Sequence, residues 1–191
     1  MLNAAETIDA VVEAVHTRPA RLGQVRLVCV DGPAGSGKTT FAASLAARLG
    51  DNAAVVHLDD LYDGWSGLEG TLWSRLEAQV LEPLRRGFPG RYQRYDWAAG
   101  QFDDWVDVPV RPVLVVEGCG SGRREGASLT TLLVWVEAPP DERLRRGLER
   151  DGEPVRDRWT AWMVEENRHF AANDTRARAD VRLDGSDGMH S

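Results

Sequence analysis

Hydrophobic positions change their spacing several times along the chain, and these changes divide it into strands and helices. Short apolar runs without polar alternation are typical of buried parallel strands, and they occupy residues 25–30, 53–58, 112–118 and 131–138. Apolar residues at helical spacing predict helices over 1–17, 39–49 and 71–86, and an arginine-rich helix follows the fourth run. A last strand is predicted over 179–185, followed by a disordered tail over 186–191.

Residues 88–110 follow neither period. The segment is rich in aromatic residues and is interrupted by proline and glycine. A long irregular segment inside a compact domain is more often functional or covered by a partner than a simple connection. We therefore expect an irregular binding segment here, with Trp97 and Trp105, like Trp65 before them, in loops.

Strands that alternate with helices and are apolar throughout predict an α/β fold, with a mostly parallel five-stranded sheet and helices on both faces. The 191 residues fit one domain, over residues 1–185. In such sheets ligands bind beyond the carboxyl ends of the strands. The acids that follow the four apolar runs should therefore lie at one edge of the sheet: Asp31, Asp59, Glu117 and Glu137.

A glycine-rich segment separates the first strand from the helix that follows it. Its residues 32–39, GPAGSGKT, match G-x-x-x-x-G-K-[ST] in full. In this P-loop motif backbone N–H groups converge on phosphates, the lysine reaches the β- and γ-phosphates, and the last hydroxyl binds Mg²⁺. The motif predicts a P-loop NTPase fold with ATP and Mg²⁺ as cofactors. The expected nucleotide contacts are Gly32, Ala34, Gly35, Ser36, Gly37, Lys38, Thr39 and Thr40.

Lys38 is the only lysine in the chain, against 22 arginines. An ammonium is a compact point charge and a guanidinium a wide planar fork, so the two are not interchangeable at a site shaped for one of them. The solitary lysine therefore indicates a chemical requirement for an ammonium at this position.

Further motifs resemble one family. HLDDLYDGW, residues 57–65, is similar to the end of the second strand in the uridine kinase-like branch of the P-loop kinases, which includes nucleoside, nicotinamide-riboside, pantothenate and phosphoribulose kinases. The resemblance implies that Asp59 is the base towards an acceptor hydroxyl, with Asp60 as the alternative. A turn-forming aspartate pair is the structural explanation of the same residues. Phosphoryl transfer independently calls for a carboxylate that orients the attacking hydroxyl.

The resemblance continues in order over about residues 25–185. Residues 113–118, VLVVEG, resemble the family strand whose glutamate works near the metal, which implies a metal site of Thr39, Glu117 and Asp59. Residues 143–151 resemble a helix that leads into a small arginine-containing lid, expected at about 150–160. The implied catalytic residues are Asp59, Lys38, Arg150, Arg156 and Arg158. Arg143, Arg145 and Arg146 fit a phosphate role or a solvated helix face paired with Asp141, Glu142 and Glu149.

Tyr95-Asp96-Trp97 resembles the element on which nucleoside kinases of this family seat the base. Uridine kinases continue with a histidine and an arginine that help to bind the nucleoside, whereas this chain continues AAGQ. The aromatic residues nearby fit either stacking on a flat acceptor or a hydrophobic plug under the long segment. The expected substrate-binding residues are Asp60, Tyr62, Trp65, Glu69, Tyr95, Asp96 and Trp97.

Composition narrows the expected partners. The formal net charge is −7, which disfavours a nucleic-acid partner held by phosphate neutralisation. No apolar run approaches the roughly 20 residues that span a bilayer, and the N-terminal segment carries acids instead of the positive start of a signal peptide. Cys29 and Cys119 are expected to be buried thiols. We expect a cytoplasmic protein whose partner is a small-molecule acceptor, without nucleic-acid or membrane partners, and leave a homodimer open.

Three functions remain. The first is a kinase that transfers a phosphoryl group from ATP to a hydroxyl of a small, nucleoside-like molecule. The second, a nucleoside monophosphate kinase, needs extra cations on the acceptor side, which Arg75, Arg85, Arg91 and Arg94 could supply. The third is an ATP-binding regulatory module without transferase activity, which would need neither Asp59 nor an arginine lid.

Overall fold

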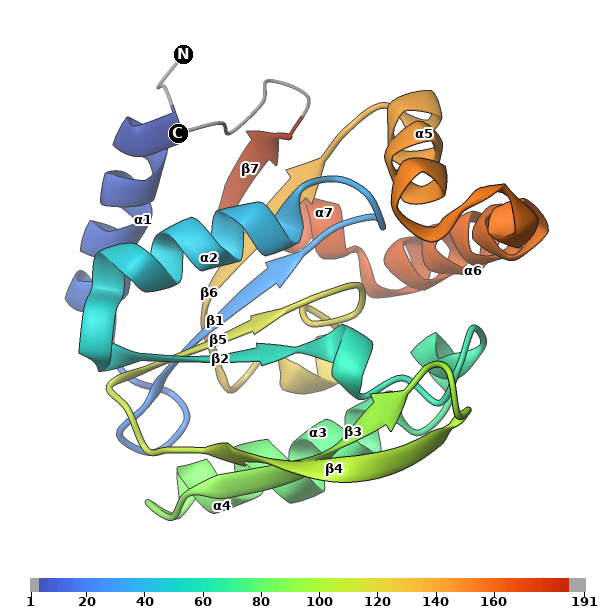
Figure 1. Ribbon diagram of the computed structural model, residues 1–191. Helices are drawn as coiled ribbons and strands as arrows, with labels where there is room; N and C mark the ends of the chain where they lie inside the picture. Colours follow the sequence, from blue (N-terminus) through green and yellow to red (C-terminus); the bar gives the residue numbers. More distant parts are fainter. Residues whose placement is uncertain (1–3, 186–191) are drawn as a thin grey trace.

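The apolar runs and the last predicted strand form one parallel sheet in the computed structural model, which describes residues 4–185 (Figure 1). Its strands are β1 (Arg26–Asp31), β2 (Ala53–His57), β5 (Val113–Glu117), β6 (Thr130–Glu137) and β7 (Val181–Asp184). They lie in the order β2-β5-β1-β6-β7, and each neighbouring pair is parallel. The predicted α/β fold is confirmed, whereas the tail expected to be disordered, 186–191, lies outside the described residues.

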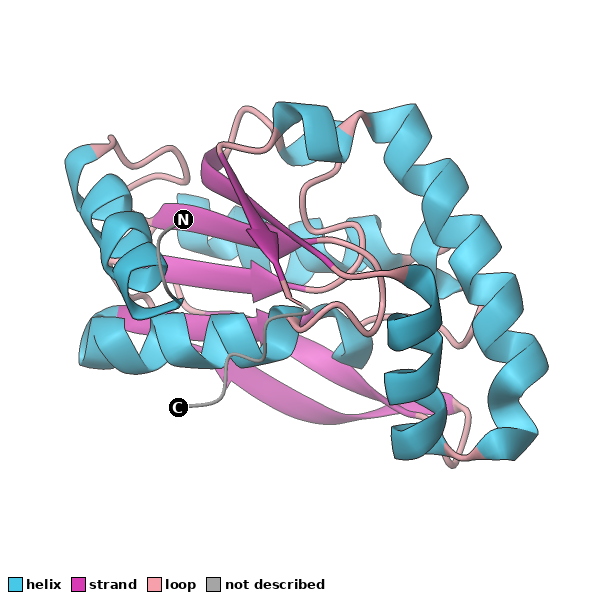
Figure 2. Cartoon of the chain, turned by 90° about the horizontal axis from the view of Figure 1, so that it is seen from above, coloured by secondary structure: helices cyan, strands magenta, loops and turns pink. Residues whose placement is uncertain are grey.

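Helices cover both faces of this sheet (Figure 2). They are α1 (Ala4–Thr17), α2 (Lys38–Leu49), α3 (Leu72–Leu76), α4 (Glu82–Arg85), α5 (Pro140–Asp151), α6 (Arg156–Asn173) and α7 (Thr175–Arg178). On one face, α1 and α2 share a core with β1, where Phe41 is buried with Val28 and Val30. On the other face, Cys29 of β1 belongs to a second core that includes residues of α3, α4 and α6.

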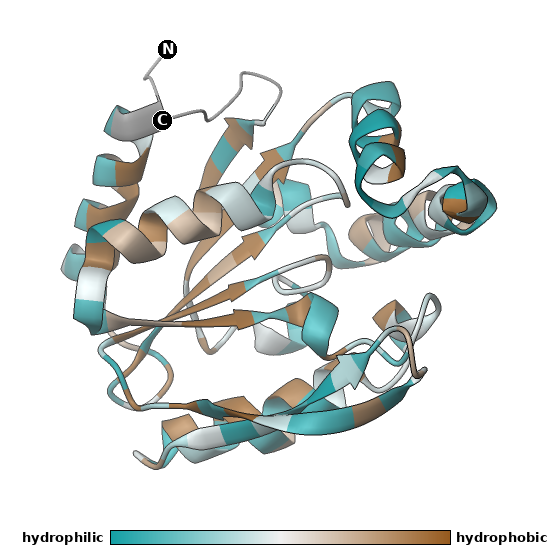
Figure 3. Ribbon diagram, viewed as in Figure 1, coloured by the Kyte–Doolittle hydropathy of each residue, from teal (hydrophilic) through white to brown (hydrophobic). Residues whose placement is uncertain are grey.

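A strand buried on both sides must be apolar throughout, because its successive side chains point to opposite faces of the sheet. Every residue of β5 is buried, and so are the six residues from Thr131 to Val136 of β6. Figure 3 shows these apolar strands at the centre of the molecule, between helices whose outer faces are more polar. The two cysteines, Cys29 and Cys119, are buried free thiols, as predicted.

The helix predicted over 71–86 is observed as three consecutive helical pieces, α3, η4 (Glu77–Leu81) and α4. The central piece is a π-helix. The apolar residues of this segment recur every four positions, which is longer than the 3.6-residue period of an α-helix. The wider π turn accommodates that spacing, and all four apolar side chains are buried: Leu72, Leu76, Val80 and Leu84.

Short 3₁₀ turns complete the helical structure: η1 (Gly50–Asn52), η2 (Leu58–Asp60), η3 (Gly67–Glu69), η5 (Arg124–Gly126) and η6 (Glu153–Val155). The expected lid, at about residues 150–160, lies where α5 and α6 are joined through η6. No helix within residues 4–185 combines the length and apolarity needed to cross a membrane.

The prediction that residues 88–110 are irregular was wrong. They form a two-stranded antiparallel hairpin of β3 (Gly90–Asp96) and β4 (Gln101–Val108), which lies beside β2 at the edge of the molecule (Figure 1). Trp105 consequently lies in a strand and pairs with Gln93, whereas Trp97 lies in the turn between the strands, as predicted.

The hairpin has no clear sequence period because most of its side chains are exposed. Among the large apolar residues of the two strands, Tyr92 and Val108 are buried. A register shift between Gln93 and Tyr95 further breaks the alternation. Polar positions on both faces therefore hid the two-residue repeat that usually identifies a strand.

Candidate active site

The phosphate-binding loop joins β1 to α2, and its shape requires glycine. Gly35 and Gly37 have φ angles of 76° and 98°, in the left-handed region that favours glycine. A Cβ atom on Gly32 would lie 2.0 Å from the backbone oxygen of Val136, and one on Gly35 would lie 2.7 Å from that of Arg143. The loop is therefore held tightly between the end of β6 and α5, and it leads directly into the N-terminus of α2.

Lys38 is the first residue of α2, and only 7% of its surface is exposed. Its Nζ donates a hydrogen bond to the backbone oxygen of Pro33 at 2.9 Å and lies 3.7 Å from Sγ of Cys119. Burial favours the neutral amine, but attraction to three nearby carboxylates outweighs it, so the pKa of Lys38 is raised. The three carboxylates are those of Glu117, Glu166 and Asp59. The Lys38 ammonium therefore stays charged.

Glu117 is the last residue of β5 and places its carboxylate beside the phosphate-binding loop. The residue is only 4% exposed. The hydroxyl of Thr39 donates to this carboxylate, and both of its oxygens lie 3.3 Å away. On the other side, Nδ1 of His57 lies 2.7 Å from Oε1 of Glu117. That hydrogen bond raises the pKa of His57 against the opposing effect of burial. Glu117 is thus oriented by one neighbour from α2 and one from β2.

The pairing of Thr39 with Glu117 fits the expected metal. Mg²⁺ is usually bound by one or two carboxylates, keeps several waters and takes its remaining ligands from phosphate. One hydroxyl and one carboxylate next to a phosphate-binding loop supply that donor set, and Asp59 lines the same cavity. Within the described residues, no group of three or more His, Cys, Asp or Glu side chains is arranged to hold a metal alone. A Mg²⁺ here would therefore be bound together with nucleotide phosphates.

Asp59 lies in η2, directly after β2, and its side chain is exposed to the cavity. The protein groups packed around the carboxylate disfavour its charged form and Glu117 repels its charge, so the pKa of Asp59 is raised. Nε1 of Trp97 donates a hydrogen bond to the backbone oxygen of Asp59 at 3.0 Å, which ties this turn to the hairpin. A carboxylate with a raised pKa is a stronger base than an ordinary aspartate.

One cavity of about 1050 Å³ joins these groups. The predicted residues that line it come from the loop, from the acceptor side and from the lid. They are Ala34, Gly35, Gly37, Lys38, Thr39, Thr40, Asp59, Asp60, Tyr62, Trp65, Trp97, Glu117, Arg150 and Arg158. The structure therefore brings most of the sequence-predicted site together.

Aromatic rings form one wall of the cavity. The ring of Trp65 lies 5.8 Å from that of Trp97 and 6.4 Å from those of Trp159 and Trp162, each edge to face. The ring of Tyr62 packs edge-on against Trp162 at 5.0 Å. The rings pack against one another, as a plug would, yet Trp97 is 44% exposed and faces the cavity. Sequence reasoning missed Trp159 and Trp162, which α6 brings to this wall.

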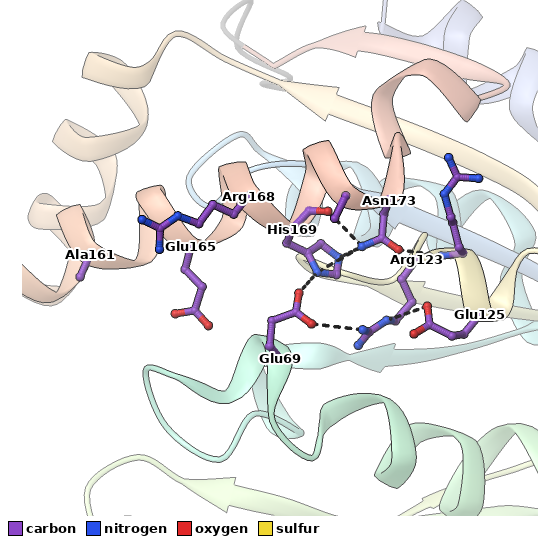
Figure 4. A pocket seen from close by; sticks show the side chains of 10 residues that line it. Glu69, Arg123, Glu125, Ala161, Glu165, Arg168, His169 and Asn173 are labelled. Carbon is purple, nitrogen blue, oxygen red and sulfur yellow. Dashed lines mark hydrogen bonds and ion pairs between the residues drawn. The ribbon is translucent and has the colours of Figure 1, made fainter.

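Glu69, an expected substrate-binding residue, does not line this cavity. Its carboxylate pairs with Nδ1 of His169 and lies 3.2 Å from Nη2 of Arg123. These residues line a second pocket of about 800 Å³, in which side chains of α6 face η3 and the turn at 123–125 (Figure 4).

Three further expected residues also lie outside the lining of the large cavity. Tyr95 packs against Trp97, with ring centres 5.3 Å apart. Asp96 closes the hairpin turn, because its Oδ1 accepts the N–H groups of Ala98 and Ala99 at 2.8 and 2.9 Å. Arg156 pairs with Glu153 of η6. Gly32 and Ser36 of the phosphate-binding loop do not line the cavity. The buried Ser36 hydroxyl has no hydrogen-bond partner among the described residues.

Comparison with protein-family models matches residues 28–173 to the AAA domain. The matched part runs from β1 to the end of α6 and covers more than half of the chain. The chain belongs to the AAA domain family.

Solved structures show that this AAA domain has the fold of the P-loop kinases. A protein described as a possible uridine kinase, from Bacillus stearothermophilus, has a TM-score of 0.71 and 19% identity, over 96% of this chain and 100% of that one. A protein assigned as a fructose transport system kinase, from Silicibacter sp. TM1040, has a TM-score of 0.65 and 20% identity, over 95% and 99%. D-glycerate 3-kinase from Cryptococcus neoformans has a TM-score of 0.51 and 14% identity, over 92% and 87%. The resemblance to uridine kinase-like proteins is thus confirmed at the level of the fold.

The arginines at the start of α5 divide between two roles in this AAA domain. Arg145 pairs with Glu149 and Arg146 with Glu142, as expected of a solvated helix face, although both arginines also line the cavity. Arg143 differs, because it is buried and pairs with Glu166 of α6. No sequence motif pointed to Glu166, which lies in a helix with few signals other than its aromatic residues.

Two of the four acids expected at one sheet edge interact with other parts of the AAA domain and do not line the cavity. Asp31 is fully buried and accepts the N–H groups of Gly32, Gly120 and Gly122 at 2.7, 3.0 and 2.8 Å. It therefore holds the segment after β5 next to the phosphate loop. Glu137 pairs with Arg176 of α7 at 2.7 Å. Of these four acids, Asp59 and Glu117 line the cavity.

Proposed function

We propose that this AAA domain is a kinase that transfers the γ-phosphoryl group of ATP, with Mg²⁺, to a hydroxyl of a small nucleoside-like molecule. The observation that carries the proposal is that Asp59, a carboxylate of raised pKa, shares one cavity with Lys38 and Thr39. A regulatory module that only binds nucleotide has no use for a base that faces its phosphates.

In the proposed reaction the acceptor oxygen forms a bond to the γ-phosphorus, and the bond from that phosphorus to the bridging oxygen of ADP breaks. Asp59 orients the attacking hydroxyl and takes its proton. Lys38 stabilises the charge on the phosphate oxygens, and Arg150 and Arg158 add positive charge from the lid. Mg²⁺ bound at Thr39 and Glu117 would neutralise phosphate charge.

The acceptor side of the cavity supports a flat acceptor without a phosphate group of its own. Trp65, Trp97 and two aspartates line it. None of the four arginines that a nucleoside monophosphate kinase could use is part of the lining. Three of them are held in ion pairs on the surface: Arg85 with Glu82, Arg91 with Asp107 and Arg94 with Asp104.

The fourth arginine, Arg75, lies with its guanidinium carbon 3.4 Å from the centre of the Phe102 ring. A monophosphate acceptor would therefore find none of these four arginines in the cavity wall. The kinase names carried by structures of the same fold support the reaction class, and they differ in the acceptor that they name.

An ATP-consumption screen over nucleosides, nucleotides, vitamins and sugars tests the proposal, with Lys38→Ala as the blank. We expect Mg²⁺-dependent turnover with nucleoside-like alcohols and none in the variant. Stimulation by monophosphates but not by nucleosides would identify a nucleoside monophosphate kinase. ATP binding without any consumed acceptor would favour the regulatory module, and wild-type turnover in Lys38→Ala would refute the kinase assignment.

A further inference from the structure

A buried ion pair joins the two helices that flank the lid. Arg143 lies on α5 and Glu166 on α6, and Nη1 of the arginine lies 2.7 Å from Oε1 of the glutamate. Their side chains are 4% and 0% exposed. The chain joins α5 to α6 through the short turn at η6, and Trp159 of α6 donates a hydrogen bond to Asp151 of α5 at 2.9 Å. The buried pair is a further link between the two helices, away from the turn.

Both partners of the pair also bind the phosphate loop, at a single residue. Oε2 of Glu166 accepts the N–H group of Ala34 at 2.8 Å, and Nη1 of Arg143 donates to the backbone oxygen of Ala34 at 3.2 Å. Glu166 also accepts Nε1 of Trp162 at 3.1 Å and lies 3.5 Å from Sγ of Cys119. Both backbone groups of Ala34 are thus held by side chains from the lid helices.

A buried ion pair contributes little to stability on balance, because the cost of removing two charges from water offsets their attraction. Well-packed apolar residues of similar volume often stabilise a fold as well or better. This pair instead supplies hydrogen bonds to a peptide that apolar side chains could not bind. Its location at the phosphate loop therefore indicates a functional contribution.

We propose that Arg143 and Glu166 are positioning residues of the phosphate-binding loop, which act through Ala34 and couple the loop to the lid helices. Neither side chain lines the cavity, so neither touches the nucleotide directly. Arg143 also neutralises a carboxylate that would otherwise repel an entering triphosphate. The inference rests on ATP binding in the proposed function but not on the identity of the acceptor.

The double variant Arg143→Met with Glu166→Leu separates positioning from stability, because it leaves no buried charge unpaired. We expect the double variant to fold with a lowered melting temperature, because Ala34 and Trp162 lose hydrogen-bond partners. We expect its ATP dissociation constant to rise about tenfold, since hydrogen bonds to charged groups are worth at least that factor. Calorimetric titration with ATP and Mg²⁺ measures the affinity. The matched control is Arg48→Met with Asp9→Leu, which removes an exposed ion pair of 2.7 Å between α1 and α2 and should leave the ATP affinity unchanged.

A folded double variant with an ATP dissociation constant within twofold of the wild type would overturn the positioning role. Where the double variant does not fold, Glu166→Gln serves instead, because it keeps the shape of the side chain and one acceptor oxygen. It should raise the KM for ATP and leave the KM for the acceptor unchanged. Unfolding of Glu166→Gln would assign the pair a purely structural role and also overturn the proposal. Failure of the wild type to bind ATP would contradict the proposed function itself.

Discussion

The phosphate side and the acceptor side of the cavity are built in opposite ways. The phosphate side is one continuous segment, residues 32–40, whose loop admits no Cβ atom at Gly32 or Gly35. The acceptor side is assembled from distant parts of the chain: Asp59 from η2, Trp97 from the hairpin turn and Trp159 from α6. In the proposed kinase a local pattern therefore specifies phosphate binding, whereas tertiary packing specifies the acceptor.

The two sides also differ in charge. The phosphate side presents Lys38 and the N-terminus of α2, both of which attract anions. The acceptor side presents Asp59 and Asp60 together with aromatic rings. Under the proposed function this contrast places the anionic ligand on one side and an acceptor without phosphate on the other, and each side can be tested separately.

The largest effect is expected at Lys38, on the phosphate side. Lys38→Arg keeps the positive charge, but the wide guanidinium does not fit between Pro33 and Cys119. We expect kcat/KM to fall on the order of 10³-fold, close to the loss in Lys38→Ala, as for a cation that stabilises the transferred phosphoryl group. Steady-state kinetics on folded variants measure the effect. Retention of most activity in Lys38→Arg would show that the solitary lysine is not a chemical requirement.

The next largest effect is expected at Asp59, on the acceptor side. Asp59→Asn should lower kcat by about 10²-fold, at the lower end of general-base contributions because a loose transition state needs little proton transfer. A base acts only when ionised, so in the wild type kcat/KM should fall as the pH drops through the pKa of Asp59. Because that pKa is raised, the fall should begin above the ordinary aspartate value of about 4.

Asp60→Asn is the matched variant for this experiment. The Asp60 carboxylate accepts a hydrogen bond from the hydroxyl of Tyr92 at 2.8 Å, so it is already engaged by the hairpin. We expect Asp60→Asn to keep the acidic limb of the pH profile that Asp59→Asn loses. The reverse result would assign the base to Asp60.

The sequence predicted the position of the glycine-rich loop between the first strand and the next helix, and the reason is physical. Gly35 and Gly37 are needed for the backbone conformation of the loop, and the Lys38 side chain reaches back to Pro33 within the same loop. Both properties depend on a few consecutive residues, so a short motif can specify them. The apolar runs likewise predicted the sheet, because strands buried on both faces carry no polar residues.

The rest could not be predicted because its causes lie far apart in the chain. The hairpin was missed because its exposed strands show no alternation. Glu69 was expected at the acceptor but pairs with His169, a hundred residues away. Glu166 reaches Ala34 across 132 positions, and nothing in its neighbourhood distinguishes it from any other glutamate of a surface helix.

A smaller effect on the acceptor side is expected at Trp97. Trp97→Ala removes an exposed ring from the cavity wall, and stacking on an aromatic ring is worth about 1–3 kcal/mol per base. We expect the KM of a flat acceptor to rise about tenfold while the KM for ATP stays the same. Trp105→Ala is the control, because Trp105 is 49% exposed on the same hairpin but outside the cavity. Equal effects of the two variants would favour the hydrophobic plug over stacking.

The smallest effect is expected at His57, which orients Glu117 where the two sides meet. The hydrogen bond to Glu117 raises the pKa of His57 in the folded state. The resulting stabilisation is therefore complete below the unfolded pKa of about 6.5 and is lost as the pH rises through the folded pKa. Because the His57 side chain is 43% exposed, this contribution to the free energy of unfolding should be only about 0.2–1 kcal/mol.

Denaturant unfolding of the wild type and of His57→Gln measures this contribution. The measurements run from about pH 5 to about pH 9, a range that includes the ordinary histidine pKa of about 6.5. The difference in unfolding free energy should be largest at the acidic end and should shrink as the pH rises above 6.5. His16→Gln removes an exposed histidine of α1 that has no ion pair within residues 4–185, and it should show no such trend. A difference that grows with pH would mean that the neutral imidazole stabilises the fold and that His57 and Glu117 do not form an ion pair.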